Sequence, residues 1–96
     1  MAAPLAPEAR DQAVSELDDW SLADDGKAIQ RSFEFDDFPE AFGFMTKVAV
    51  AAEKMDHHPD WSNSWNRVVI DVTSHDSGGV TARCVELARR IDAART

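Results

Sequence analysis

Three histidines are the residues of this chain best suited to moving protons near neutral pH. His57 and His58 stand side by side before Pro59 in EKMDHHPDW, and His75 follows in TSHDSGG. An imidazole has an ordinary pKa of ~6.5, so it can donate or accept a proton at pH 7. Two or three of them in one pocket would supply an acid and a base together. Any single one can instead be a polar residue that satisfies the last carbonyls of a helix.

The same residues are poor candidates for a metal site. The side chains of adjacent residues diverge in extended backbone, whereas histidine pairs that bind zinc on a helix are spaced four residues apart. Cys84 is the only cysteine, and its spacing does not mark it as a further ligand. We therefore expect neither a metal nor an organic cofactor.

Hydrophobic periodicity predicts the elements that position the histidines. In chain order they are a helix at 6–17, a hairpin at 20–35, a helix at 36–56, a hairpin at 60–74 and a last helix from Thr81. The fold class is α+β, with a four-stranded antiparallel sheet, three helices on one face and the order α-β-β-α-β-β-α. The central helix must end before Pro59. His57 and His58 then meet His75 at one edge of the sheet.

The central helix has an unusually broad apolar surface. Its main stripe, at steps of three and four, consists of Phe42, Met45, Val48, Ala49, Ala52 and Met55. Three further apolar residues fall partly off that stripe: Phe38, Phe44 and Val50. This pattern indicates burial against a second subunit as well as against the sheet.

Length and charge restrict the class of protein. The chain has 96 residues, enough for one domain at 7–96 after a flexible leader at 1–6. A net charge of -8 argues against binding to nucleic acid or to an anionic membrane surface. No apolar run approaches the roughly 20 residues that span a bilayer. A single cysteine fits a reducing cytoplasm, and a core this small favours oligomerisation.

Two residues near the histidines have two possible roles each. Trp61 offers a flat face to a planar ligand, or it is an aromatic that packs on the sheet. Glu53, one turn before His57, can orient an imidazole or remain a solvated charge. No glycine-rich phosphate loop is present, because Gly78-Gly79 lacks the lysine and the spacing. Spacing alone therefore predicts a proton-transfer pocket without naming a substrate.

A longer pattern resembles the pterin-4a-carbinolamine dehydratases, over about residues 15–92. It lies within the segment that begins FPEAFGFMTKVA and consists of Glu53, His57, His58, Pro59, an aromatic at Trp61 or Trp65, and His75. The resemblance implies the same order of elements, and dimers or tetramers built partly on the central helix. It also implies a lyase that removes water from 4a-hydroxytetrahydropterin to give quinonoid dihydropterin. That reaction recycles pterin for aromatic amino-acid hydroxylases.

The resemblance also assigns residue roles. His57 and His75 would be acids, one for each face of the pterin, and His58 would be a base and a binding group. The remaining substrate-binding positions would be Glu53, Pro59, Trp61, Ser74, Asp76 and Ser77. The family pattern usually has an aspartate nine residues after the third histidine, where this chain has Cys84. We expect a neutral thiol there to orient His75 less strongly, with Asp76 or Asp92 as substitutes.

A second function stays open. Some relatives are non-enzymatic dimerisation partners of a homeodomain transcription factor, through the same helical surface. An exposed apolar face on the central helix would serve that purpose too. The complete set of three histidines favours the enzyme.

Overall fold

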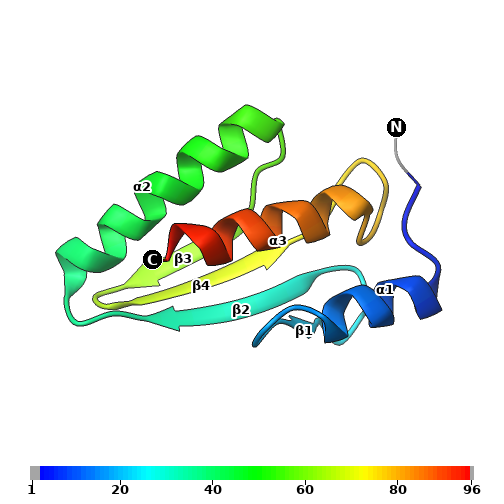
Figure 1. The fold of residues 1–96 in the computed structure, drawn as a ribbon, viewed down its shortest axis with the longest axis horizontal. Helices are drawn as coiled ribbons and strands as arrows, with labels where there is room; N and C mark the ends of the chain where they lie inside the picture. Colours follow the sequence, from blue (N-terminus) through cyan, green and yellow to red (C-terminus); the bar gives the residue numbers. More distant parts are fainter. Residues whose placement is uncertain (1–2, 96) are drawn as a thin grey trace.

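The computed structural model describes residues 3–95 and confirms the predicted order of elements (Figure 1). These are α1 (Pro7–Ser15), β1 (Ser21–Leu22), β2 (Ile29–Glu34), α2 (Phe38–Met55), β3 (Asp60–Ser64), β4 (Arg67–Val72) and α3 (Ala82–Ala94). The first predicted strand is only two residues long. The fold class is α+β, as the sequence predicts.

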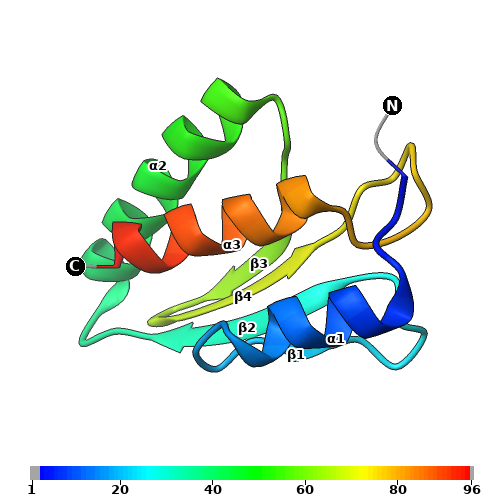
Figure 2. The same cartoon turned by 45° about the vertical axis from the view of Figure 1, so that its right-hand side comes forward.

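The four strands form one antiparallel sheet in the order β1-β2-β4-β3. Helices α2 and α3 lie together on one face of this sheet, and α1 lies beside β1 (Figures 1 and 2). The other face carries polar side chains such as Gln30, Ser32 and Ser62, which alternate with the inward residues. This layering leaves the carboxyl end of β4 close to the end of α2, where the histidines are.

The core forms between the sheet and the two helices. Its sheet side consists of Ile29, Phe33, Val68, Ile70 and Val72, all nearly or fully buried, as predicted for the two alternating strands. Burying one such side chain contributes about 1.5–3 kcal/mol. Its α3 side is Cys84, Val85, Leu87, Ala88 and Ile91. The sheet and the two helices that carry the histidines are therefore held together by contacts between segments far apart in the sequence.

The predicted apolar stripe of α2 is partly wrong. The residues that the fold buries are Ala41, Phe44, Val48 and Ala52, whereas Phe42 is 57% exposed and Ala49 is also exposed. Both sets follow the same helical period and share Val48 and Ala52, so periodicity alone could not choose between them. Phe44 decides the choice because it packs against the Phe33 and Phe35 rings of the sheet, with centroids 4.8 and 5.0 Å away.

The predicted leader has fixed contacts where the structure describes it. The Leu5 amide donates a hydrogen bond to the Val80 carbonyl at 2.8 Å, and the Leu5 side chain packs against the core. Met1 and Ala2 lie outside the described residues. Within residues 3–95, every helix is too short or too polar to cross a bilayer.

Candidate active site

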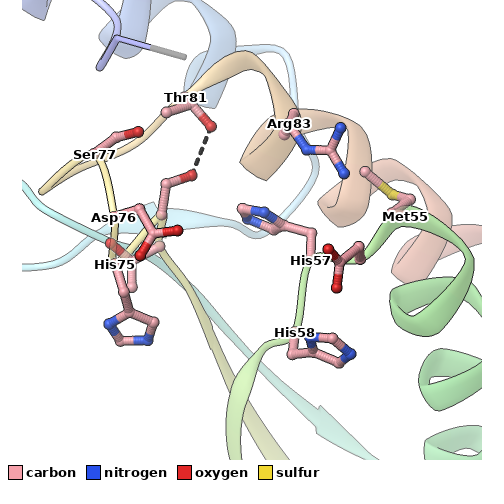
Figure 3. A pocket seen from close by; sticks show the side chains of 11 residues that line it. Met55, His57, His58, His75, Asp76, Ser77, Thr81 and Arg83 are labelled. Carbon is pink, nitrogen blue, oxygen red and sulfur yellow. Dashed lines mark hydrogen bonds between the residues drawn. The ribbon is translucent and has the colours of Figure 1, made fainter. Parts of the chain in front are cut away.

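A cavity of about 680 Å³ opens between the end of α2, the loop after β4 and the start of α3 (Figure 3). Its lining is Met55, Asp56, His57, His58, Thr73, Ser74, His75, Asp76, Ser77, Thr81 and Arg83. All three histidines therefore line one cavity, although His75 is far from the other two in the sequence. His57 points into the middle, and His58 and His75 lie below it on opposite sides (Figure 3).

The end of α2 fixes the backbone of His57. Asp56 adopts a left-handed conformation with φ 51°, and its amide bonds to the Glu53 carbonyl at 3.1 Å. The His57 amide reaches back to the Ala52 carbonyl at 3.0 Å. This pair of bonds is a Schellman motif, which satisfies the last carbonyls of a helix and turns the chain sharply. The His57 side chain is consequently directed across the cavity.

The His57 imidazole is half-buried, and its pKa is lowered from 6.5. Burial is the largest cause, because it penalises the charged form. The Arg83 guanidinium and the other two histidines lower the pKa further, while the Asp56 carboxylate opposes them. His57 is therefore mainly neutral at pH 7.

His58 and His75 each have a carboxylate partner. His58 Nε2 is 2.9 Å from Glu53 Oε1, and His75 Nε2 is 3.0 Å from Asp60 Oδ2. An ionised carboxylate only accepts, so each Nε2 must carry a proton and each Nδ1 is the nitrogen left free. The sequence placed Glu53 one turn before His57, but the structure pairs it with His58.

The loop after β4 presents His75 and its neighbours. The Ser74 amide bonds to the Gly79 carbonyl at 3.0 Å, and the Gly78 amide bonds to the Ser74 carbonyl at 2.9 Å. Gly78 has φ +75°, a conformation that residues with a Cβ rarely adopt. The loop folds back on itself in this way, and His75, Asp76 and Ser77 all line the cavity.

Cys84 contacts a different histidine from the expected one. Its Sγ lies 3.5 Å from His57 Nε2, whereas His75 has Asp60 as its partner. The sulfur is also 3.3 Å from Ser74 Oγ, and it accepts from the Thr81 amide at 3.4 Å. Asp92, which we considered as a substitute carboxylate for His75, instead binds Trp20 and Arg31. Any effect of the cysteine therefore acts on His57.

Sequence reasoning missed three residues of the site. Asp60 binds His75, and the sequence placed it only as the first residue of a strand. Thr81 was predicted only as the start of the last helix, but its hydroxyl also hydrogen-bonds to Ser74 Oγ at 2.7 Å. Figure 3 draws this bond as the dashed line from Thr81. Arg83 lines the cavity beside His57. Arg83 stands directly before Cys84, the position that differs from the family pattern, and this neighbourhood was the sequence signal that could have identified it.

Three expected substrate-binding residues do not line this cavity. Glu53 bonds to His58, Trp61 packs against the hydrophobic core from β3, and Pro59 lies between α2 and β3. Their contact with substrate stays a prediction. Across residues 3–95, no three or more histidine, cysteine, aspartate or glutamate side chains are grouped to hold a metal ion.

The sequence matches proteins of one family over nearly its whole length. Residues 3–94 fit the family model described as pterin 4 alpha carbinolamine dehydratase. A relative from Mesorhizobium japonicum, provisionally named pterin-4-alpha-carbinolamine dehydratase, is 56% identical over 92% of this chain and 90% of its own. A relative from Rhizorhabdus wittichii with the same provisional name is 54% identical over 94% of this chain and 93% of its own.

Solved structures agree with this assignment. The crystal structure of a transcriptional coactivator/pterin dehydratase from Brucella melitensis has a TM-score of 0.93 and 42% identity, covering 97% of this chain and 99% of that one. A pterin dehydratase-like RuBisCO assembly factor of the alpha-carboxysome has a TM-score of 0.68 at 19% identity, covering 79% and 88%. That second likeness concerns the fold alone. With the family model matched over residues 3–94 and relatives above half identity, this chain belongs to the pterin 4 alpha carbinolamine dehydratase family.

Proposed function

We propose that this protein removes water from 4a-hydroxytetrahydropterin to give quinonoid dihydropterin, with His57, His58 and His75 as the proton-transfer groups. The observation that carries the proposal is the meeting of all three imidazoles on one cavity, in a chain of this family. The volume of about 680 Å³ suits a small-molecule site. The reaction would return pterin to aromatic amino-acid hydroxylases.

The chemistry needs one proton delivered and one removed. Hydroxide is a poor leaving group from C4a, so an acid must protonate it as the C–O bond breaks. The proton on N5 must pass to a base as the new double bond forms. Each positioned proton transfer is typically worth ~10²–10⁴ in rate.

The hydrogen bonds suit the roles that the family resemblance implies. Neutral His58 keeps its proton on Nε2, toward Glu53, so Nδ1 is free to act as the base. Protonated His75 has a charge-assisted bond to Asp60, and Nδ1–H is the proton it can give to the substrate. His57 would be the second acid. Its lowered pKa makes it a stronger acid in the smaller fraction of molecules that hold the proton.

The remaining lining offers polar contacts for the pterin ring. We propose that Ser74, Asp76, Ser77 and backbone groups of residues 57–59 and 74–77 bind the ring edge. The loop bonds of Ser74 hold this segment in place before substrate arrives, which reduces the entropy lost on binding.

The test is a His57→Ala/His75→Ala double variant, assayed for loss of the 4a-hydroxyl beside the spontaneous reaction. We expect turnover to fall by ~10²–10⁴ or to the spontaneous rate, because both acids are lost. Both side chains are on the cavity surface, so the urea midpoint should stay near that of the unmodified protein. Near-normal dehydration by the folded double variant would exclude this mechanism.

A second function is favoured by one observation, the exposed apolar side of α2. Phe38, Phe42 and Val50 are 46%, 57% and 52% exposed. We propose that this surface joins copies of the chain into a homodimer or homotetramer. A role as an interaction module is the alternative, in line with the coactivator name of the Brucella melitensis relative. A purified stoichiometric complex with another protein, together with no pterin turnover, would favour that alternative.

A further inference from the structure

A second cavity, of about 620 Å³, lies between the end of α2 and the outer side of α3. It is lined by Lys54, Met55, Ala82, Arg83, Glu86, Arg89 and Arg90. Met55 and Arg83 also line the histidine cavity, so the two spaces are neighbours that share a wall. Figure 3 shows these two side chains at the edge of the histidine cavity, next to His57.

The charge of this groove is opposite to that of the molecule. Four cationic side chains line it against one carboxylate, and they are four of only ten Lys and Arg residues in a chain of net charge -8. Arg90 bonds to Glu86 at 3.0 Å. Among residues 3–95, no ion pair is formed by Lys54, Arg83 or Arg89.

The fold itself gains little from this arrangement. Arg83 stands in the first turn of α3, where the helix dipole disfavours a positive charge. It also lowers the pKa of His57 by repulsion. Cations gathered without counter-charges repel one another, and that repulsion is relieved when an anion binds.

We propose that Lys54, Arg83 and Arg89 bind an anionic group, a carboxylate or a phosphate, on the side chain of the pterin whose ring occupies the histidine cavity. This inference rests on the proposed function and adds a substrate class to it. Met55 and Arg83 line both spaces, so a ligand that extends past these two side chains would reach from one space into the other. The substrate class is then a pterin with a negatively charged tail.

The test compares the dissociation constants of stable oxidised pterins by calorimetry at low salt. The probes are biopterin, with a neutral side chain, folic acid, with two carboxylates, and 6-hydroxymethylpterin phosphate. We expect at least one anionic pterin to bind ~10-fold more tightly than biopterin, because its tail would form two or three ion pairs with the groove. The preference should shrink as salt is added, because exposed charges are screened. The two anionic probes show whether the groove prefers carboxylate or phosphate.

The Lys54→Gln/Arg89→Gln variant should bring the ratio of anionic to neutral affinity toward one. The matched control is Arg67→Gln, an exposed arginine at the start of β4 that lines neither cavity, and it should keep the preference. Equal affinities in the unmodified protein, or a preference that survives in Lys54→Gln/Arg89→Gln, would overturn the inference.

Turnover separates this inference from the proposed function. The dehydration of a 4a-hydroxytetrahydropterin with a neutral side chain is measured on the same protein. If the protein dehydrates this substrate but shows no preference for anionic pterins, the proposed function stands and the groove is not a tail site. If the preference for anionic pterins depends on Lys54 and Arg89 but no dehydration is measured, the groove is an anion site and the proposed reaction is excluded.

Discussion

His57 is the residue whose environment makes the clearest demand on the mechanism. Its pKa is lowered from 6.5 by burial and by nearby positive charge. If His57 acts as an acid, the reactive form is the protonated one, and its population falls as the pH rises through the lowered pKa. We therefore expect the ratio of kcat/KM in the unmodified protein to kcat/KM in His57→Ala, each corrected for the spontaneous reaction, to decrease from about pH 5 toward pH 7, because the ratio removes the contribution of the base. An increase of this ratio over that range would assign His57 the role of base.

Cys84 contacts His57, and we expect its replacement to shift the same pH dependence. In Cys84→Asp a carboxylate would stand beside His57 Nε2, now 3.5 Å from the sulfur. A negative charge at that distance favours the imidazolium, so we expect the His57 pKa to rise by ~1 or more and the profile to move to higher pH. The Thr81 amide and the Ser74 hydroxyl remain as donors to the new carboxylate.

The measurement is an NMR titration of the His57 ring alongside the kinetics. Cys84→Ser is the matched control, because it changes the atom beside Nε2 without adding charge. It should move the His57 pKa much less than Cys84→Asp does. A titration curve for His57 that is the same in both variants and in the unmodified protein would remove Cys84 from the site.

At the scale of elements, local signals in the sequence predicted most of what positions the site. Pro59 marks the end of α2, Thr81 marks the start of α3, and alternation along β2 and β4 marks the inward face. The rest depends on pairs of residues distant in sequence. The bond between His75 and Asp60 needs the β3–β4 register, and the contact between Cys84 and His57 needs the packing of α3 on α2. The periodicity of a single segment cannot predict these contacts, because it says nothing about the distance between two segments.

One such long-range contact ties α3 to the sheet. Asp92 accepts from Trp20 Nε1 at 2.9 and 3.1 Å and from Arg31 Nη1 at 2.9 Å. The Arg31 side chain is only 9% exposed, and its Nε has no partner in the structure. Asp92→Ala would therefore leave the indole N–H without its carboxylate, and the nearly buried guanidinium with only the exposed Asp19 carboxylate at 3.5 Å and the Asp18 carbonyl at 3.0 Å. We expect the free energy of unfolding to fall by about 2–4 kcal/mol, measured in urea.

Glu86→Ala is the control on the same helix, because it removes one carboxylate from an exposed pair with Arg90. Such a pair contributes about 0–1 kcal/mol. Asp92 does not line the histidine cavity, so folded Asp92→Ala protein should keep its dehydration rate. Equal urea midpoints for the two variants would mean that the Asp92 bonds do not hold α3 in place.

For the whole molecule, the surface area is that of an ordinary small monomer. The accessible surface is 5667 Å² for 10.6 kDa, close to the ~5,500 Å² expected for a folded monomer of that mass. One copy of the chain is therefore as compact as an ordinary monomer of its mass. The exposed phenylalanines of α2 are not needed to fill the core, because Phe44 and Val48 of the same helix already pack there. They form an exposed apolar surface, a feature typical of protein–protein contacts.

We expect copies of the chain to assemble through that surface. Phe38 and Phe42 lie one helical turn apart, with ring centroids separated by 5.9 Å, and form the most apolar part of the outer side of α2. If copies of the chain pair there, Phe42→Glu places a carboxylate in a dry contact and costs the assembly much more than it costs the monomer. We expect the unmodified protein to sediment as a dimer or tetramer and Phe42→Glu to dissociate at least ~10-fold more readily.

Ala9→Glu adds the same charge to an exposed position of α1 and should leave the assembly intact. A monomeric unmodified protein at micromolar concentration, or equal sedimentation of the two variants, would contradict this role for α2. Within one copy of the chain, the end of α2, the loop after β4 and the start of α3 already bring the three histidines to one cavity. Dissociated Phe42→Glu protein should therefore still dehydrate its substrate, and a loss of turnover on dissociation would mean that a second copy completes the site.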